Sequence, residues 1–255
     1  MDKLNKVAQI TVYFWIMKIL ATTLGETAGD LLSMTLNLGY VAGLLITGCF
    51  FAAILFVQLK FKMFHSFIHW AVIVGTTMVG TEISDMMDRT LHLGYAAGSA
   101  ILFSCLALTL ALWYWQERNL GVYPIYDRKK ELFYWIAILF SNSLGTAFGD
   151  FLSDNMGLSY IGGAIVCAGI IALVIALHYW TRINHVFLFW VAFVFTRPFG
   201  ATFGDLLTKP VAKGGFNLGT LPASAVTLLL LTGIVFYTHL RYKQIERNKG
   251  DGHLY

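Results

Sequence analysis

Long apolar runs, separated by short polar segments, set the pattern of the whole chain. Eight such runs fall at 8–29, 39–58, 66–87, 94–115, 132–153, 159–180, 185–206 and 219–240. Each run has about 20 residues, which is the length of helix that crosses the hydrocarbon core of a bilayer. The pattern therefore predicts an all-α, polytopic membrane protein, with eight transmembrane helices in a single membrane domain over 1–255.

The composition supports this prediction. Hydrophobic residues make up 57% of the chain and charged residues 13%, whereas soluble proteins carry about 25% charged residues. The mean hydropathy is +0.67. The net charge of +4 is small. It reflects where the basic residues sit along the chain, and we expect no nucleic-acid partner.

The odd-numbered runs are copies of one another. An aspartate stands at or near the end of each, with a glycine five residues before it and a tryptophan fifteen residues before it. The aspartates are Asp30, Asp85, Asp150 and Asp205, the glycines are Gly25, Gly80, Gly145 and Gly200, and the tryptophans are Trp15, Trp70, Trp135 and Trp190. This agreement predicts four two-helix repeats in the same orientation, over about 8–58, 66–115, 132–180 and 185–240. The extra length between the second and third repeats lies in a polar connector, 116–131.

Small residues four positions apart accompany the repeat on both of its helices. The pairs on the first helix are Gly25 and Gly29, Gly80 and Ser84, Gly145 and Gly149, and Gly200 and Gly204. The pairs on the second helix are Gly39 and Gly43, Gly94 and Gly98, Ser159 and Gly163, and Gly219 and Ala223. Small residues on one helix face let two backbones approach closely in lipid. We therefore expect four close-packed hairpins that bring four copies of one helix face together.

With these features the chain resembles an uncharacterised bacterial family of membrane proteins built from four tandem two-helix repeats, each with a signature tryptophan. The resemblance covers about residues 8–240 and rests on the tryptophan, glycine and aspartate positions above. The fourth copy departs from the others in a longer outer loop, 208–217, and lacks the tyrosine of Tyr40, Tyr95 and Tyr160. The resemblance implies the repeat architecture and brings no activity with it.

The basic residues are distributed unevenly between the two predicted ends of the helices. Thirteen lie at the N-terminus, in the loops after the second, fourth and sixth runs, or in the C-terminal tail: Lys3, Lys6, Lys60, Lys62, Arg118, Arg128, Lys129, Lys130, Arg182, Arg241, Lys243, Arg247 and Lys249. Three lie at the opposite end: Arg89, Lys209 and Lys213. Because basic loops stay in the cytoplasm, we expect both termini to be cytoplasmic and the protein to lie in the bilayer of the bacterial inner (plasma) membrane.

Acidic residues gather at the outer ends of the first helices. Eight of the fourteen lie there: Glu26, Asp30, Glu82, Asp85, Asp88, Asp150, Asp154 and Asp205. Carboxylates are costly at membrane depth, and their oxygens suit Mg²⁺, Ca²⁺ or Mn²⁺. The four repeat aspartates are therefore a hypothetical metal site, with Glu26 and Glu82 as further cation or proton ligands. The alternative is structural, with each acid solvated or paired with Arg197 or Lys209.

Polar side chains continue along the same helices toward the cytoplasmic side. Equivalent positions in the four copies hold Thr22, Thr77, Asn142 and Arg197. We interpret them as a candidate polar path, although hydroxyls at such positions also bond back to their own helix. A buried Arg197 needs a partner, so we expect a bridge to an aspartate. Pro198 predicts a kink, and Lys18 is expected to extend to the cytoplasmic surface.

Three classes of function remain. The first is a transporter or channel for a small, divalent cation, with or without proton coupling, which needs no cofactor and takes the metal ion as its substrate. The second is a non-catalytic scaffold or receptor, and the third is an intramembrane aspartyl-type enzyme. The chain has no HExxH, GxSxG or P-loop motif, so we favour transport and do not expect an enzyme. The ion, the direction of transport and the formation of homo-oligomers stay open.

Overall fold

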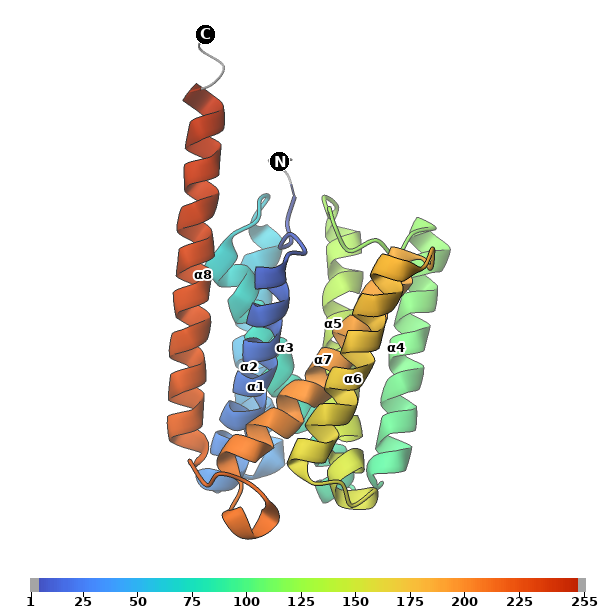
Figure 1. The fold of residues 1–255 in the computed structure, drawn as a ribbon, viewed down its shortest axis with the longest axis vertical. Coiled ribbons are helices and arrows are strands. Elements are labelled where there is room, and N and C mark those ends of the chain that lie inside the picture. Colours follow the sequence, from blue (N-terminus) through green and yellow to red (C-terminus); the bar gives the residue numbers. More distant parts are fainter. Residues whose placement is uncertain (1–4, 252–255) are drawn as a thin grey trace.

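The computed structural model describes residues 5–251, and side chains as far as residue 244 (Figure 1). The described residues form eight α-helices and no β-strand, so the chain is all-α as predicted. The helices are α1 (Val12–Asp30), α2 (Gly39–Lys60), α3 (Ser66–Asp85), α4 (Tyr95–Glu117), α5 (Arg128–Asp150), α6 (Tyr160–Trp180), α7 (His185–Thr208) and α8 (Thr220–Asp251). Among the basic residues counted above, Lys3 and the side chains of Arg247 and Lys249 lie outside the described part.

Both termini lie at the same end of the bundle, which we call the terminal end (Figure 1). The opposite end, where α1, α3, α5 and α7 finish, holds the repeat aspartates and is called the acidic end. The termini share one end because the chain forms an even number of helices, each antiparallel to the one before it.

Six helices in the described part are long and apolar enough to cross a membrane: α2, α4, α5, α6, α7 and α8. The helices α1 and α3 are not among them. Both carry charged side chains, such as Lys18 and Glu26 in α1 and Glu82 in α3, and these side chains are buried inside the bundle. Their polarity is therefore directed inward. Several long apolar helices indicate a multi-pass membrane protein.

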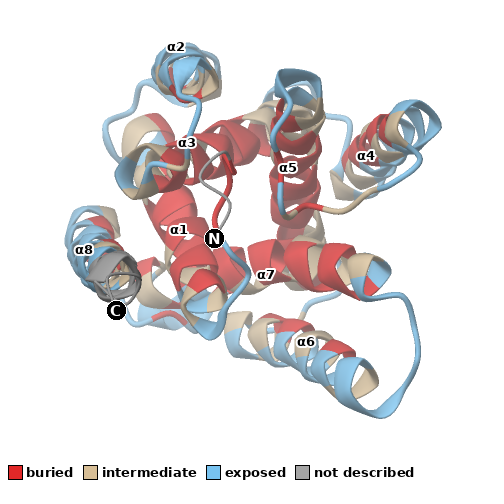
Figure 2. Cartoon of the chain, turned by 90° about the horizontal axis from the view of Figure 1, so that it is seen from above, coloured by how far each residue is buried: buried red, intermediate tan, exposed pale blue. Residues whose placement is uncertain are grey.

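Four helices, one from each repeat, form an inner ring. The helix α1 packs on α3, α3 on α5, α5 on α7, and α7 packs back on α1. Figure 2 shows this ring from above, with buried residues concentrated on it and the other four helices outside. Few residues of the outer helices α2 and α6 are buried, and their exposed side chains are largely apolar. The interior of the ring is therefore the place where polar groups are shielded from lipid.

The second helix of each repeat packs on the first helix of the next repeat. The helix α2 lies on α3, α4 on α5 and α6 on α7, and α8 closes the circle on α1. The prediction of four close-packed hairpins is therefore wrong, because the two helices of one repeat make few contacts with each other. The physical reason is that the small-residue face of each first helix is already covered by the next helix of the ring.

The repeat glycines set the spacing of the ring. A Cβ atom added at Gly25 would lie 2.1 Å from Thr77 Oγ1, and one at Gly200 would lie 2.1 Å from Thr22 Oγ1. The other two glycines follow the same rule: the added Cβ would lie 3.1 Å from Asn142 Cβ at Gly80 and 2.4 Å from Arg197 Cγ at Gly145. The glycine of each helix thus faces the polar-path position of the next helix, which allows a close approach.

The second small residue of three copies makes looser contacts of the same kind. An added Cβ would lie 3.2 Å from Thr81 Cγ2 at Gly29, 3.5 Å from Ala201 Cβ at Gly149 and 3.1 Å from Glu26 Cβ at Gly204. The close approach therefore extends over about one helical turn at the acidic half of the ring.

The first helix of three of the four repeats is followed by the same local structure at the acidic end. Directly after Asp30, Asp85 and Asp150, the chain forms one π-helical turn each: η1 (Leu31–Thr35), η2 (Met86–Thr90) and η3 (Phe151–Asn155). The helix α7 instead continues past Asp205 to Thr208 and is followed by the short 3-10 helix η4 (Val211–Lys213). Isolated π turns are frequent at functional sites.

Aromatic side chains fill the ring near the terminal end. The signature residues Trp70, Trp135 and Trp190 are buried there, whereas Trp15 is half-buried. Phe14 takes the buried position in the first copy, with its ring centroid 5.7 Å from that of Trp70. This layer separates the polar interior of the ring from the terminal end.

The N-terminal segment covers the aromatic layer. Residues 5–8 are buried, and Figure 2 shows this segment in the middle of the ring. Lys6 forms a buried salt bridge with Glu131, and Gln58 Nε2 donates to Glu131 Oε1 at 3.0 Å. These contacts fasten the N-terminal segment to α2 and α5 at the terminal end of the ring.

Candidate functional site

The repeat aspartates pair off around two basic side chains at the acidic end. Lys209 Nζ lies 2.6 Å from Asp30 Oδ2 and 3.2 Å from Asp205 Oδ1. In the other half of the ring, Arg89 lies 3.2 Å from Asp85 Oδ1 and 3.7 Å from Asp150 Oδ2. All four aspartates are buried. The four predicted metal ligands thus form two pairs in this structure, and the pairing has a two-fold pattern.

This two-fold pattern has a signal in the sequence that the repeat analysis missed. Arg89 and Lys209 each stand four residues after a repeat aspartate, in the second and fourth copies. The equivalent positions in the first and third copies hold Met34 and Asp154. Each basic residue therefore bridges the aspartate of its own copy and that of a neighbouring copy. As a result, the four copies are linked in two pairs and are not all equivalent.

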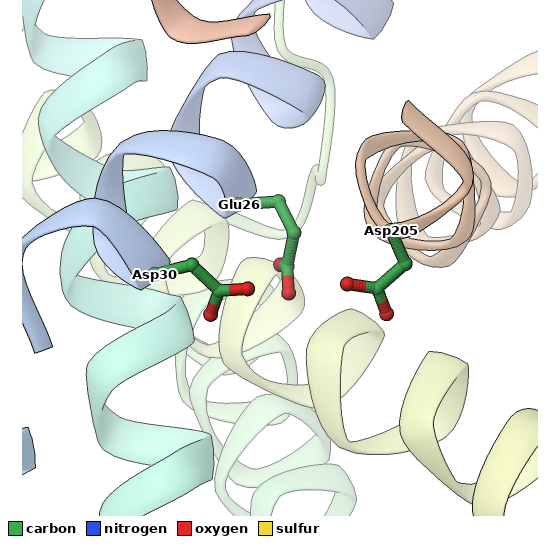
Figure 3. Close-up of side chains that lie close together, drawn as sticks. All are labelled: Glu26, Asp30 and Asp205. Atoms are coloured by element: carbon green, nitrogen blue, oxygen red, sulfur yellow. The ribbon is translucent and has the colours of Figure 1, made fainter. Parts of the chain in front are cut away.

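Glu26 joins one of the two pairs. One carboxylate oxygen from each of Glu26, Asp30 and Asp205 lies within 4.8 Å of the other two, and all three residues are buried (Figure 3). Glu26 and Asp30 are one turn apart on α1, and Asp205 reaches them from α7. We call these three residues the carboxylate triad. Three carboxylate oxygens at this separation can act together as ligands of one cation.

Arg197 lies next to the triad and is fully buried. Its guanidinium donates to Glu26 Oε2 at 2.8 Å, to the Thr22 carbonyl oxygen at 3.1 Å and to the Thr81 hydroxyl. We expected Arg197 to form a salt bridge with an aspartate. This prediction is wrong, because its acidic partner is Glu26. Glu26 is one turn closer than Asp30 to the middle of α1, at the level that Arg197 reaches. Pro198 lies inside the continuous helix α7.

Lys18 is also fully buried inside the ring. Its Nζ donates to Asn142 Oδ1 at 2.8 Å and lies 3.9 Å from the centroid of the Phe193 ring. Asn142 Nδ2 in turn donates to Thr76 Oγ1 at 3.0 Å. The prediction that Lys18 extends to the cytoplasmic surface is wrong, because the Asn142 amide oxygen binds its ammonium within the ring.

The two hydroxyls of the candidate polar path bond back to their own helix, as the alternative interpretation expects, and also lie within hydrogen-bond distance of a carbonyl of the neighbouring helix. Thr22 donates to the Ile19 carbonyl at 2.8 Å and to the Thr196 carbonyl of α7 at 3.3 Å. Thr77 donates to the Val74 carbonyl at 2.7 Å and to the Ala21 carbonyl of α1 at 3.0 Å. Of the four polar-path positions, Asn142 and Arg197 are therefore the two that hydrogen-bond to other side chains among the described residues.

Glu82 lies at the packing contact between α3 and α2. A Cβ added at Gly43 would lie 2.7 Å from Glu82 Oε2, and one at Gly29 would lie 3.6 Å from Glu82 Oε1. Neither oxygen has a hydrogen-bond partner among the described residues; the neighbouring Ser33 hydroxyl donates to the Gly29 carbonyl. A buried carboxylate without a partner is costly. The buried position of Glu82 indicates that its carboxylate can take up a proton or a cation.

Comparison with known proteins identifies the repeat. The family model of a repeat of unknown function (DUF347) matches the chain four times, at residues 13–64, 68–119, 133–184 and 188–244. None of the curated proteins and none of the solved structures matches the chain. The four matches include the tryptophan, glycine and aspartate of each copy, on which the resemblance was based. The chain therefore belongs to the family of this tandem repeat of unknown function.

Proposed function

We propose that the protein crosses the bilayer eight times and transports a small cation, best suited to be divalent, by way of the inner ring. The observation that carries the proposal is the carboxylate triad, whose three buried oxygens lie within 4.8 Å of one another. A site made of carboxylate oxygens alone suits Mg²⁺, Ca²⁺ or Mn²⁺. Glu82 is a further buried carboxylate at this end of the ring.

The eight-span topology is supported by the equivalence of the ring helices. With 19 and 20 residues, α1 and α3 run parallel to the longer α5 and α7 in one ring. Their charged side chains are buried, so lipid meets mainly apolar groups. The bias of basic residues toward the terminal end supports cytoplasmic termini in a bacterial inner membrane. The triad then lies at the outer side of the membrane.

Lys209 lies where a cation shared by Asp30 and Asp205 would bind. Its ammonium lies between Asp30 and Asp205, and its side chain is 18% exposed. A lysine side chain is long and flexible, so it can withdraw to the surface when a metal ion binds both carboxylates. Arg197 is fully buried and holds Glu26 in position. In this proposal Lys209 is exchanged for the cation, whereas Arg197 is not.

The triad is tested by asparagine substitution. Mg²⁺, Ca²⁺ or Mn²⁺ at 100 times its Kd should stabilise the wild-type protein by about 2.7 kcal/mol, measured by thermal unfolding in detergent. Asp30→Asn and Asp205→Asn should fold and lose most of this stabilisation, because each removes a charged ligand. Asp154→Asn is the matched control, since Asp154 is an exposed acid at the same end. The control should keep the response.

The same measurement has a pH dependence with a definite sign. Protons and cations compete for the triad oxygens, so the stabilisation should shrink as the pH falls and return as it rises. If no divalent ion stabilises the wild-type protein at any pH, and Asp205→Asn cells grow normally under metal stress, the transport proposal is wrong.

The orientation is tested by cysteine labelling in intact cells, with Cys49, Cys105 and Cys167 replaced by alanine. Cysteines at Asn37 and Met156, both exposed at the acidic end, should react with an impermeant reagent, and cysteines at Lys62 and Lys129 should not. Gly215 is unsuitable, because an added Cβ would lie 2.1 Å from the Lys209 carbonyl oxygen. Labelling at Lys129 from outside would reverse the proposed topology.

A non-catalytic scaffold or receptor is the second candidate. It is favoured by the observation that every repeat aspartate lies within ion-pair distance of Arg89 or Lys209. In this case the charges hold the ring together and bind no ion. The Asp205→Asn variant separates the two functions, because a scaffold would lose stability without any change in its response to cations.

A further inference from the structure

The Lys18 side chain crosses the centre of the inner ring. Its helix, α1, packs on α3 and α7, so α5 is the diagonally opposite member of the ring. The 2.8 Å hydrogen bond from Lys18 to Asn142 on α5 therefore spans the interior. Phe193 from α7 contacts the ammonium, and Thr76 from α3 holds Asn142. All four ring helices thus contribute to the place where Lys18 ends.

Arg197 crosses the ring in the same way, closer to the acidic end than Lys18. It extends from α7 to Glu26 on α1 and to Thr81 on α3, its diagonal neighbour. Lys18 stands eight residues before Glu26, which places its backbone about 12 Å further along the helix axis. A cation that leaves the carboxylate triad toward the terminal end therefore meets Arg197 first and Lys18 second.

The two cationic side chains differ in their chemistry. Arginine keeps its charge under all conditions in a protein, whereas a buried lysine can lose its proton. Arg197 has a carboxylate partner in Glu26. Lys18 takes part in no salt bridge of the described residues, and its contacts are a neutral amide and an aromatic ring.

The surroundings of Lys18 contain one further charge. Arg197, on α7, is the charged group that acts on the ammonium, and it does so by repulsion. The helices α3 and α5 present the neutral Thr76 and Asn142, and no charged side chain of α8 acts on Lys18 among the described residues. An ammonium without a counterion is costly in such a place.

We propose that Lys18 is the proton-binding group that couples movement of the cation to movement of a proton in the opposite direction. The proposal rests on the cation transport proposed above. When the triad holds no cation, its negative charge stabilises the Lys18 ammonium. When a cation neutralises the triad, the ammonium gives one proton to water that reaches the ring from the acidic end, and the electron pair of the broken N–H bond stays on Nζ. The neutral amine no longer repels the cation. The amine takes up a proton from the terminal end after the cation has left on that side.

The experiment measures cation and proton movement together in proteoliposomes that contain the full chain, with Mn²⁺, Mg²⁺ and Ca²⁺ as probes and internal dyes for metal and pH. In the wild type, cation entry should be accompanied by proton exit. Lys18→Gln keeps a partner for Asn142 but carries no titratable proton, so it should keep cation-dependent stabilisation and lose the coupled proton movement. Lys18→Arg holds a permanent charge in the ring and should lose cation flux itself.

A second measurement does not depend on flux. When Mn²⁺ is added to the purified protein in weak buffer, Lys18→Gln should release about one proton fewer per bound ion than the wild type. Lys62→Gln, at an exposed lysine of the terminal end, should behave as the wild type.

The outcomes separate the two proposals. If the wild type moves a cation and Lys18→Gln moves it with unchanged proton exit and proton release, the role of Lys18 is wrong and transport stands. If no probe cation binds or moves in the wild type, both proposals are wrong. Loss of proton exit in Lys18→Gln with retained cation binding would support both.

Discussion

Gly200→Leu is expected to prevent the ring from closing, and the protein should be recovered at a small fraction of the wild-type yield. Even a Cβ atom at Gly200 would lie 2.1 Å from Thr22 Oγ1 and 3.0 Å from the Thr23 backbone nitrogen. The backbone cannot withdraw without opening the contact between α7 and α1. Overpacking of this kind costs about 1–3 kcal/mol for small insertions, and more where backbone is the obstacle.

The fold offers matched controls for this prediction. At Gly169 in α6 an added Cβ would meet no atom within 4 Å, and at Gly149 it would lie 3.5 Å from Ala201 Cβ, an ordinary contact. Gly169→Leu should therefore leave yield and melting temperature close to the wild type, and Gly149→Ala should be tolerated. Size-exclusion profiles and thermal unfolding in detergent give both quantities. Equal behaviour of Gly200→Leu and Gly169→Leu would show that the ring contact is not needed.

The helices and their repetition could be predicted from the sequence because hydropathy and spacing are local properties. The glycine rows were also visible, since small residues four positions apart mark a close contact. Which helix makes the contact was not visible. The same glycine face of α1 fits α2 of its own hairpin or α3 of the next repeat, and only the closure of four repeats into a ring selects α3.

The site was predicted in its residue types and only partly in its grouping. A repeat suggests four equivalent aspartates, but the structure breaks the equivalence through Arg89 and Lys209, which occur in alternate copies. The position of Lys18 was missed because its partner, Asn142, is 124 residues away in the sequence. An apolar run with one lysine looks the same whether the lysine faces the membrane surface or the centre of a ring.

Arg197→Met is expected to be the most destabilising change of a polar residue in the ring. Arg197 is fully buried, and its loss leaves Glu26 without its 2.8 Å partner and Thr81 and the Thr22 carbonyl without a donor. Removing one member of a buried ion pair costs about 3–5 kcal/mol, because an uncompensated charge stays in a medium of low polarity. The melting temperature in detergent should fall accordingly, measured in the absence of divalent ions.

The pair Arg197→Met and Glu26→Gln forms a double-mutant cycle that separates charge compensation from packing. If the cost of Arg197→Met comes from the unpaired Glu26 carboxylate, the double variant should be more stable than Arg197→Met alone, since replacing both members of a buried pair is often nearly neutral. A divalent cation supplies the missing positive charge by another route. Mn²⁺ should therefore raise the melting temperature of Arg197→Met more than that of the wild type, because an unpaired Glu26 is a stronger ligand in the triad. It should not do so in the double variant. An Arg197→Met protein that responds to Mn²⁺ no better than the double variant would show that Glu26 does not bind the cation.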